Sequence, residues 1–167
     1  MTIKERKEKT KEQKEMTEVK SKEVSMPATA TRKEWKITVN SPWFEHIRDK
    51  KKIYEGRCLW KNNALYKIGD ILYIHQFGCG YDDDEEKKDK KGDKSCEPFK
   101  VIIQDISRFA NFTDALNEVM KVSGSIETIL PGISSVKEGV EIYEKFYSPE
   151  SQLTYGVALF KLRKVAF

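Results

Sequence analysis

The stretch that decides the fold is "SPWFEHIRDKKKIYEGR", residues 41–57, because its pattern changes from helical to extended within a few positions. Ser41 is a residue type that caps helices, and Pro42 suits the first position of a helix. Phe44 and Ile47 lie three residues apart and therefore share one helix face. The second half of the stretch contains a charged cluster embedded in a strand pattern. A helix leading directly into a strand is therefore expected here.

The rest of the chain adds strands on both sides of this unit. Residues 34–40, "EWKITVN", alternate apolar and polar side chains with the two-residue period of a half-buried strand. The predicted strands cover residues 34–40, 53–60, 71–74, 99–109 and 155–162. A Gly69-Asp70 turn precedes the third of them. Two further helices are predicted, one capped by Thr113 and one opened by a capping box at Ser135 and Glu138. This order predicts an α+β fold, a small and partly closed β-barrel of about five strands with flanking helices.

Two segments fall outside this pattern. Residues 1–34 contain too few apolar side chains to offset chain entropy, so we expect a disordered charged tail before a domain at 35–167. Residues 78–98 alternate acidic and basic blocks and are punctuated by Gly and Pro, which indicates a mobile charged loop inserted in that domain. Its "DDDEE" run lacks the glycine and ligand spacing of a calcium loop, so no metal site is expected.

Charge and cysteine content narrow the possible partners. The formal net charge is +4, of which residues 1–34 hold +3 (10 Lys/Arg against 7 Asp/Glu) and the remaining 133 residues only +1 (21 against 20). Nucleic-acid binding would therefore need a local basic patch rather than the global charge.

The three cysteines match no zinc spacing and are an odd number, which predicts reduced thiols. No membrane span or signal peptide is visible, and we expect a cytoplasmic or nuclear monomer without a cofactor.

The charged cluster at the start of the second strand contains the candidate site. In an extended segment, Glu55 and Arg57 face the same way, while Lys52 is free to lean to either side. Gly56 between them allows another group to approach the backbone closely. A partly buried acid–guanidinium pair would leave Arg57 donors for a phosphate or a base edge. The alternative is a solvated cross-strand salt bridge of little energetic weight.

The same segment resembles the signature of the ASCH domain (activating signal cointegrator-1 homology), G-x-K-x-x-E-x-R. Lys52, Glu55 and Arg57 match its three charged positions, whereas Lys50 replaces its glycine. The stretches "YKIGDILYI" (66–74), "FKVIIQDISRFANFTDAL" (99–116) and "EIYEKFYSPESQLTYGVALFKL" (141–162) are similar to further motifs of that family, in the same order. The resemblance covers about residues 35–165 and implies a PUA-like barrel, with a ligand cleft between the first helix and the strand of the charged motif.

RNA or nucleotide binding is the first function that the resemblance implies. Lys51, Lys52 and Arg57 would hold backbone phosphates, and Trp43 or Tyr155 would stack an unpaired base. Glu55 completes the expected ligand-binding set. For Trp43, packing against the barrel is an equally good interpretation.

Two alternatives stay open. Some small ASCH proteins resemble hydrolases, and Lys52 with Glu55 would then be the catalytic pair, for example in metal-free RNA cleavage. An N4-acetylcytidine amidohydrolase fits less well, because the position expected to hold its threonine nucleophile is Glu55. The third possibility is a regulatory adaptor that contacts protein partners through the tail and the charged loop.

Overall fold

The computed structural model describes residues 32–79 and 96–165. Its strands are β1 (Glu34–Val39), β2 (Tyr54–Cys58), β3 (Ile71–Gln76), β4 (Phe99–Phe109) and β5 (Val157–Lys164). Its helices are α2 (Trp43–Arg48), α3 (Phe112–Ser123), α4 (Val136–Glu144) and α5 (Pro149–Tyr155), with a short 3-10 helix η1 (Lys61–Leu65). The predicted α+β class is confirmed.

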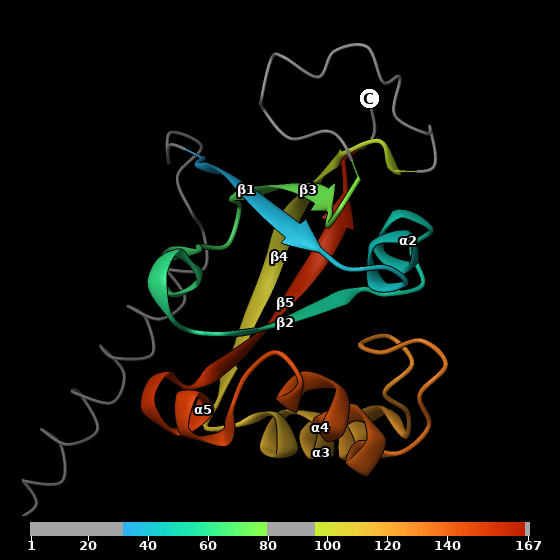
Figure 1. The fold of residues 1–167 in the computed structure, drawn as a ribbon, viewed down its shortest axis with the longest axis vertical. Helices are drawn as coiled ribbons and strands as arrows, with labels where there is room; N and C mark the ends of the chain where they lie inside the picture. Colours follow the sequence, from blue (N-terminus) through green and yellow to red (C-terminus); the bar gives the residue numbers. More distant parts are fainter. Residues whose placement is uncertain (1–31, 80–95, 166–167) are drawn as a thin grey trace, which may run out of the picture. The chain divides into compact units, whose positions relative to one another are not determined.

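The five strands form one mixed sheet in the order β1-β3-β4-β5-β2. β1 runs parallel to β3, and every other neighbouring pair is antiparallel. The sheet curls into a half-barrel, with α3, α4 and α5 gathered on one side and α2 apart from them (Figure 1). The expected partial closure is therefore present, and β1 and β2 are the two edge strands.

β5 explains how this sheet is stabilised, because both of its faces are covered. Ala158, Phe160 and Leu162 pack into a core with α2 and the strands β1, β3 and β4. Val157 and Leu159 point the other way, into a second core formed with α3 and α4. All of Val157–Phe160 is buried, as expected for a strand covered on both sides, which reads as a continuous apolar run.

The helix caps differ from those expected. Asn111, not Thr113, caps α3, and its side chain accepts a hydrogen bond from the Asp114 N–H at 2.8 Å. Ser41 does not cap α2, because its hydroxyl donates to the Glu45 carboxylate instead. The Ser135 cap of α4 is confirmed by its bond from the Glu138 N–H.

The sequence patterns predict neither the short 3-10 helix η1 nor one α-helix of the described chain, α5. α5 opens with Ser148 as its cap and Pro149 at its first turn, and it ends at Gly156. Tyr155 therefore belongs to α5, and the last strand starts at Val157 rather than at Tyr155. The Ser-Pro-Glu start is a recognisable helix signal.

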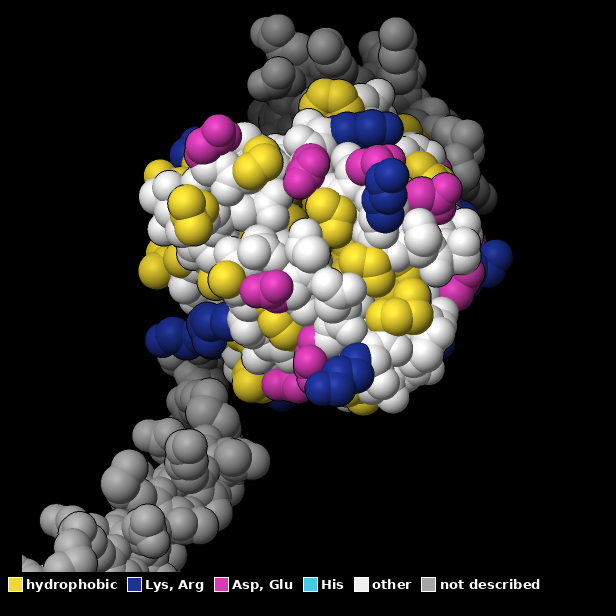
Figure 2. Space-filling model, turned by 90° about the horizontal axis from the view of Figure 1, so that it is seen from below, with side chains coloured by type: hydrophobic (Ala, Val, Ile, Leu, Met, Phe, Trp, Pro, Cys, Tyr) yellow, Lys and Arg dark blue, Asp and Glu magenta, His cyan; other side chains and the backbone are white. Residues whose placement is uncertain are grey.

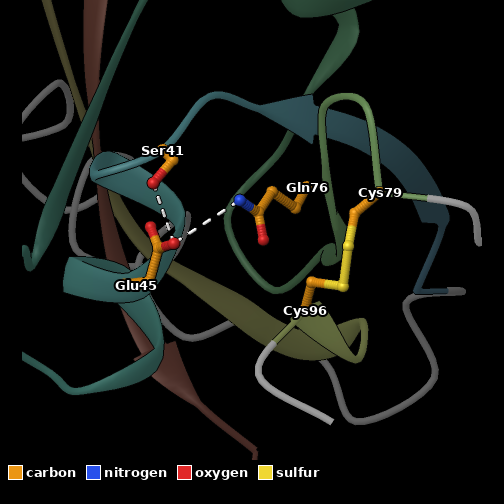
Figure 3. Close-up of a disulfide and its surroundings, with 5 residues drawn as sticks. All are labelled: Ser41, Glu45, Gln76, Cys79 and Cys96. Atoms are coloured by element: carbon orange, nitrogen blue, oxygen red, sulfur yellow. Dashed lines mark hydrogen bonds between the residues drawn. A yellow bond between two sulfur atoms is a disulfide. The ribbon is translucent and has the colours of Figure 1, made fainter. Parts of the chain in front are cut away.

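A disulfide overturns the prediction that all cysteines are reduced thiols. Cys79 follows β3 and Cys96 precedes β4, and their sulfur atoms are bonded (Figure 3). β3 and β4 are antiparallel neighbours, so the end of one strand lies beside the start of the next. Cys58 is the free cysteine of the described chain and is buried. The odd cysteine count thus reflects one bridge plus one buried thiol.

The predicted tail and charged loop lie largely outside the described residues. Residues 1–31 and 80–95 are not described, and these include the "DDDEE" run. β1 begins at Glu34, the last residue assigned to the tail. No helix among residues 32–79 and 96–165 is long and apolar enough to cross a membrane.

On the face of the molecule that Figure 2 shows, hydrophobic side chains form separate groups with charged side chains between them.

Candidate functional site

A pocket of about 220 Å³ lies where β1, α2, β2 and α4 meet. Its walls combine ionic, aromatic and aliphatic side chains. They are Thr38, Val39, Asn40, Trp43, Lys52, Glu55, Gly56, Arg57, Phe77, Leu130, Ile142, Tyr143, Phe146 and Tyr147. The three charged residues of the sequence motif therefore line one cavity.

Lys52 is the most buried cation of this pocket, with 3% of its surface exposed. Its ammonium donates a hydrogen bond to the Ile129 carbonyl and lies 5.8 Å from the centre of the Trp43 ring. Burial lowers the pKa of Lys52 from its usual value to about 8, although the negative charge of Glu55 opposes that shift. Lys52 therefore changes charge in the mildly alkaline range.

Glu55 and Arg57 form the predicted partly buried pair. Arg57 Nε lies 3.4 Å from Glu55 Oε1, with side-chain exposures of 17% and 10%. Burial is the largest single influence and opposes the charge of Arg57, but the Glu55 carboxylate and the smaller effects of nearby tyrosines together outweigh it and raise the pKa of the guanidinium. The alternative considered above, a solvent-exposed salt bridge, does not fit because both side chains are largely buried.

Arg57 also joins the two edges of the sheet. Its Nη2 donates to the Thr38 carbonyl at 3.0 Å. Thr38 belongs to β1 and Arg57 to β2, which are the outermost strands. The pocket therefore opens at the seam of the half-barrel, and we call the Arg57–Thr38 contact the seam bond.

Two buried polar atoms of the pair have no hydrogen-bond partner in the described part of the chain. They are Glu55 Oε2, an acceptor, and Arg57 Nε, a donor. An unmade buried hydrogen bond costs about 1–3 kcal/mol. A ligand that shifts the pair and offers a donor beside an acceptor would recover this energy at both atoms.

α4 supplies the part of the pocket that sequence reasoning missed. Tyr143 stacks on Phe112 with ring centres 4.0 Å apart, and its hydroxyl lies over Gly56. Burial, together with the charge of Glu55, raises the pKa of Tyr143 well above its ordinary value. Burial also raises the pKa of Tyr147, with Arg57 opposing. Tyr143 lies on α4 and Tyr147 follows its end, and nothing local in the sequence placed either of them over β2.

Two other predicted site residues lie elsewhere. Lys51 is exposed and does not line the pocket. Tyr155 is half exposed on α5, where its ring lies 6.4 Å from that of Trp60. Trp43 does line the pocket, and it also packs partly against both cores. Packing of Trp43 against the barrel is therefore present, and stacking of Trp43 on a base stays a prediction.

No group of three or more His, Cys, Asp or Glu side chains suited to a metal ion occurs within the described residues. The site is thus an ionic and aromatic pocket of a small α+β half-barrel.

Comparison with known proteins gives the fold but no family. No family model and no curated protein matches the chain. The crystal structure of the hypothetical protein PH0355 is similar, with 26% identity and a TM-score of 0.59, over 79% of this chain and 99% of that one. The solution structure of PF0455 from Pyrococcus furiosus is similar too, with 25% identity and a TM-score of 0.54, over 80% and 99%. Neither name states an activity.

Proposed function

We propose that the pocket binds RNA or a nucleotide by accepting one unpaired base. The observation that carries this proposal is the buried donor–acceptor pair of Arg57 Nε and Glu55 Oε2. The Watson–Crick edges of bases present donors and acceptors side by side, and single-stranded RNA is read through such edges. The resemblance of Lys52, Glu55 and Arg57 to the ASCH motif favours the same ligand class.

The size and lining of the pocket suit a base. About 220 Å³ is below the ~300–1,000 Å³ that is usual for ligand pockets, which favours one ring system over a dinucleotide. Trp43, Phe146 and Tyr147 line it, and aromatic side chains of this kind stack on bases. With Lys52 protonated, the three ionic groups carry a net charge of +1, which complements a carbonyl-rich or anionic ligand.

The test is fluorescence anisotropy with a labelled single-stranded RNA and its DNA equivalent. The Lys52→Ala/Arg57→Ala variant should lose binding, and the milder Glu55→Gln variant should weaken it. Lys121→Ala/Lys137→Ala removes the same charge from exposed helix positions outside the pocket and is the matched control. Thermal melting of each variant separates loss of binding from loss of folding. Absence of wild-type binding at low salt to both the RNA and the nucleoside monophosphates would refute the proposal.

A hydrolase remains the second candidate because of one observation, the lowered pKa of Lys52. A group with a pKa near the working pH is suited to proton transfer, and Lys52 reaches about 8 through burial. Glu55 would act as the base, the Lys52 ammonium would protonate the leaving oxygen, and Arg57 would stabilise developing charge on a phosphate. Analysis of the same RNA on a gel after incubation tests this. Equal RNA loss with wild type and Glu55→Gln would argue against cleavage at this site.

A further inference from the structure

A second concavity lies on the other side of Lys52, between the end of α2 and the strands β4 and β5. It has a volume of about 330 Å³, and we call it the basic groove. Its charged lining residues are all cations, namely Lys50, Lys52, Lys161, Arg163 and Lys164. Lys52 is the one lining residue that the groove shares with the pocket. The two cavities are therefore neighbours with a common wall.

This concentration of positive charge is local. Residues 35–167 carry 21 basic and 20 acidic residues, so the basic groove does not simply reflect a basic domain. Lys50, Lys161 and Arg163 form no ion pair with the described residues. Lys164 donates to the Arg48 carbonyl at 3.3 Å, which holds its ammonium near the groove.

Asp49 and Asp105 are neighbours in sequence of the groove residues Lys50 and Gln104, and both carboxylates make other contacts. Asp105 lies opposite Lys161 in the β4–β5 register, and its carboxylate accepts the Ile106 N–H. Asp49 pairs with Arg48 at 3.0 Å, a contact that lowers its pKa, with smaller effects from Lys51 and Lys164. Neither carboxylate lines the basic groove.

Two backbone features place side chains at the groove. Lys50 has a φ of +63°, a conformation that is unfavourable for residues with a Cβ and common for glycine. The β4–β5 register shifts between Ile103 and Asp105, and such a bulge redirects the side chain of the extra residue. That residue is Gln104, an exposed amide that lines the groove. Both backbone irregularities therefore occur at residues that line the basic groove.

We infer that the basic groove holds the phosphates of the RNA strand whose base occupies the pocket. This inference rests on the proposed function. The shared wall at Lys52 makes the two cavities contiguous, so one strand would place a base on one side of Lys52 and flanking phosphates on the other. Gln104 adds a neutral donor for a phosphate or ribose oxygen. The groove then contributes affinity that depends on salt and chain length, whereas the pocket contributes base recognition.

The test compares two ligand sizes across a salt series. The probes are a labelled single-stranded RNA of about ten nucleotides, a length chosen to reach past the pocket, and the four nucleoside monophosphates. The groove variant is Lys50→Ala/Lys161→Ala/Arg163→Ala. The matched control Lys121→Ala/Lys137→Ala/Lys145→Ala removes equal charge from exposed residues outside both cavities.

The groove variant should bind the RNA at least tenfold more weakly and show a flatter salt dependence. Each lost phosphate contact lowers the slope of log affinity against log salt by about 0.7 for a single strand, hence by about 2 for three contacts. Its monophosphate binding should match that of the wild type. The control variant should keep a steeper RNA slope than the groove variant.

A second variant separates binding from stability. Lys50→Gly removes the cation and also suits the positive φ, so its melting temperature should be no lower than that of the wild type while its RNA affinity falls. RNA binding with the wild-type slope in both groove variants would overturn the inference and leave the pocket proposal standing. If the wild type binds monophosphates but no RNA, and the pocket variants lose that monophosphate binding, the inference about the groove is overturned and the pocket proposal stands. Failure of the wild type to bind either probe would overturn both.

Discussion

Gly56 and Tyr143 are in such close contact that a Cβ on Gly56 would lie 2.5 Å from the Tyr143 hydroxyl. This contact joins β2 to α4, and it fixes one wall of the pocket. Gly56 is therefore required by the space it leaves for a neighbour, not by its backbone conformation.

Gly56→Ala should consequently destabilise the protein and deform the pocket. Overpacking of a fitted core costs about 1–3 kcal/mol, and chemical denaturation would measure it as a lower midpoint. Tyr143→Leu in the same protein removes the ring that the new methyl group meets. The double variant should therefore lose less stability than the sum of the two single variants. Strict additivity would show that the contact does not restrict position 56.

Lys52 should make stability depend on pH in the alkaline range. Its pKa is lowered to about 8 in the folded protein against an ordinary 10.5, so between these values the unfolded chain binds more protons. The contribution of Lys52 to the unfolding free energy therefore rises as pH increases from about 8 to 10.5, and it is least favourable below pH 8. The buried tyrosines act in the opposite direction above pH 10, because their pKa values are raised.

Denaturation of wild type and Lys52→Met between pH 7 and 9.5 checks this prediction. The stability of the wild type relative to the variant should increase with pH, on the order of 1–2 kcal/mol over this range. A difference independent of pH would show that Lys52 titrates normally. RNA affinity, if it depends on the ammonium charge, should fall over the same range.

Glu55 should control the charge state of Lys52. Its carboxylate is the group that raises the pKa of Lys52 against the effect of burial. Glu55→Gln should therefore move the Lys52 pKa below 8, measured by NMR of the lysine side-chain carbon and nitrogen signals. Glu45→Gln, on α2 outside the pocket lining, provides the control. An unchanged Lys52 titration in Glu55→Gln would mean that the two groups are not coupled.

Asp70 should be a stability determinant remote from the pocket. Its buried carboxylate accepts hydrogen bonds from the Lys33 N–H, the Trp35 indole and the Lys67 N–H, at 3.0–3.1 Å. Asp70→Ala leaves these donors without their acceptor and should cost about 2–4 kcal/mol. Asp114→Ala, an exposed carboxylate in the first turn of α3, should cost at most about 1 kcal/mol. Equal losses in the two variants would contradict this role for Asp70.

The Cys79–Cys96 bridge should stabilise the fold by closing a long loop. The two cysteines are 17 residues apart, and a loop of about that length corresponds to roughly 3 kcal/mol of chain entropy. Denaturation with and without reductant should show this loss in the wild type and in Cys58→Ala. Cys79→Ser/Cys96→Ser should be insensitive to reductant. Labelling of three thiols in unreduced, denatured wild type would contradict the bridge.

Local pattern was sufficient for most of the fold. A strand buried on one face alternates apolar and polar residues, as around Trp35, and a strand buried on both faces is a continuous apolar run, as from Val157. Both patterns therefore predict strands directly. The cap of α4 at Ser135 was equally local. α5 was missed because its seven residues follow the previous helix closely, and Tyr155 was assigned to the strand that follows.

The candidate site needed more than local pattern. The two-residue spacing placed Glu55 and Arg57 together, since β geometry alone sets that relationship. Which way Lys52 leans was left open, because its position depends on the Ile129 carbonyl, 77 residues later. Tyr143 reaches the pocket through helix packing, and the Cys79–Cys96 pairing depends on which strands are neighbours. These are tertiary relationships without a short-range signal.

The seam bond places a pocket side chain, that of Arg57, against the backbone of the opposite edge strand at Thr38. A ligand that draws the guanidinium away from the Thr38 carbonyl would release one edge strand from the other, whereas a ligand that leaves it in place would brace both. Amide hydrogen exchange along β1 would then speed up in the first case and slow down in the second. The rate of amide hydrogen exchange along β1 would therefore show how a bound ligand holds Arg57, and the ligand itself would need no label.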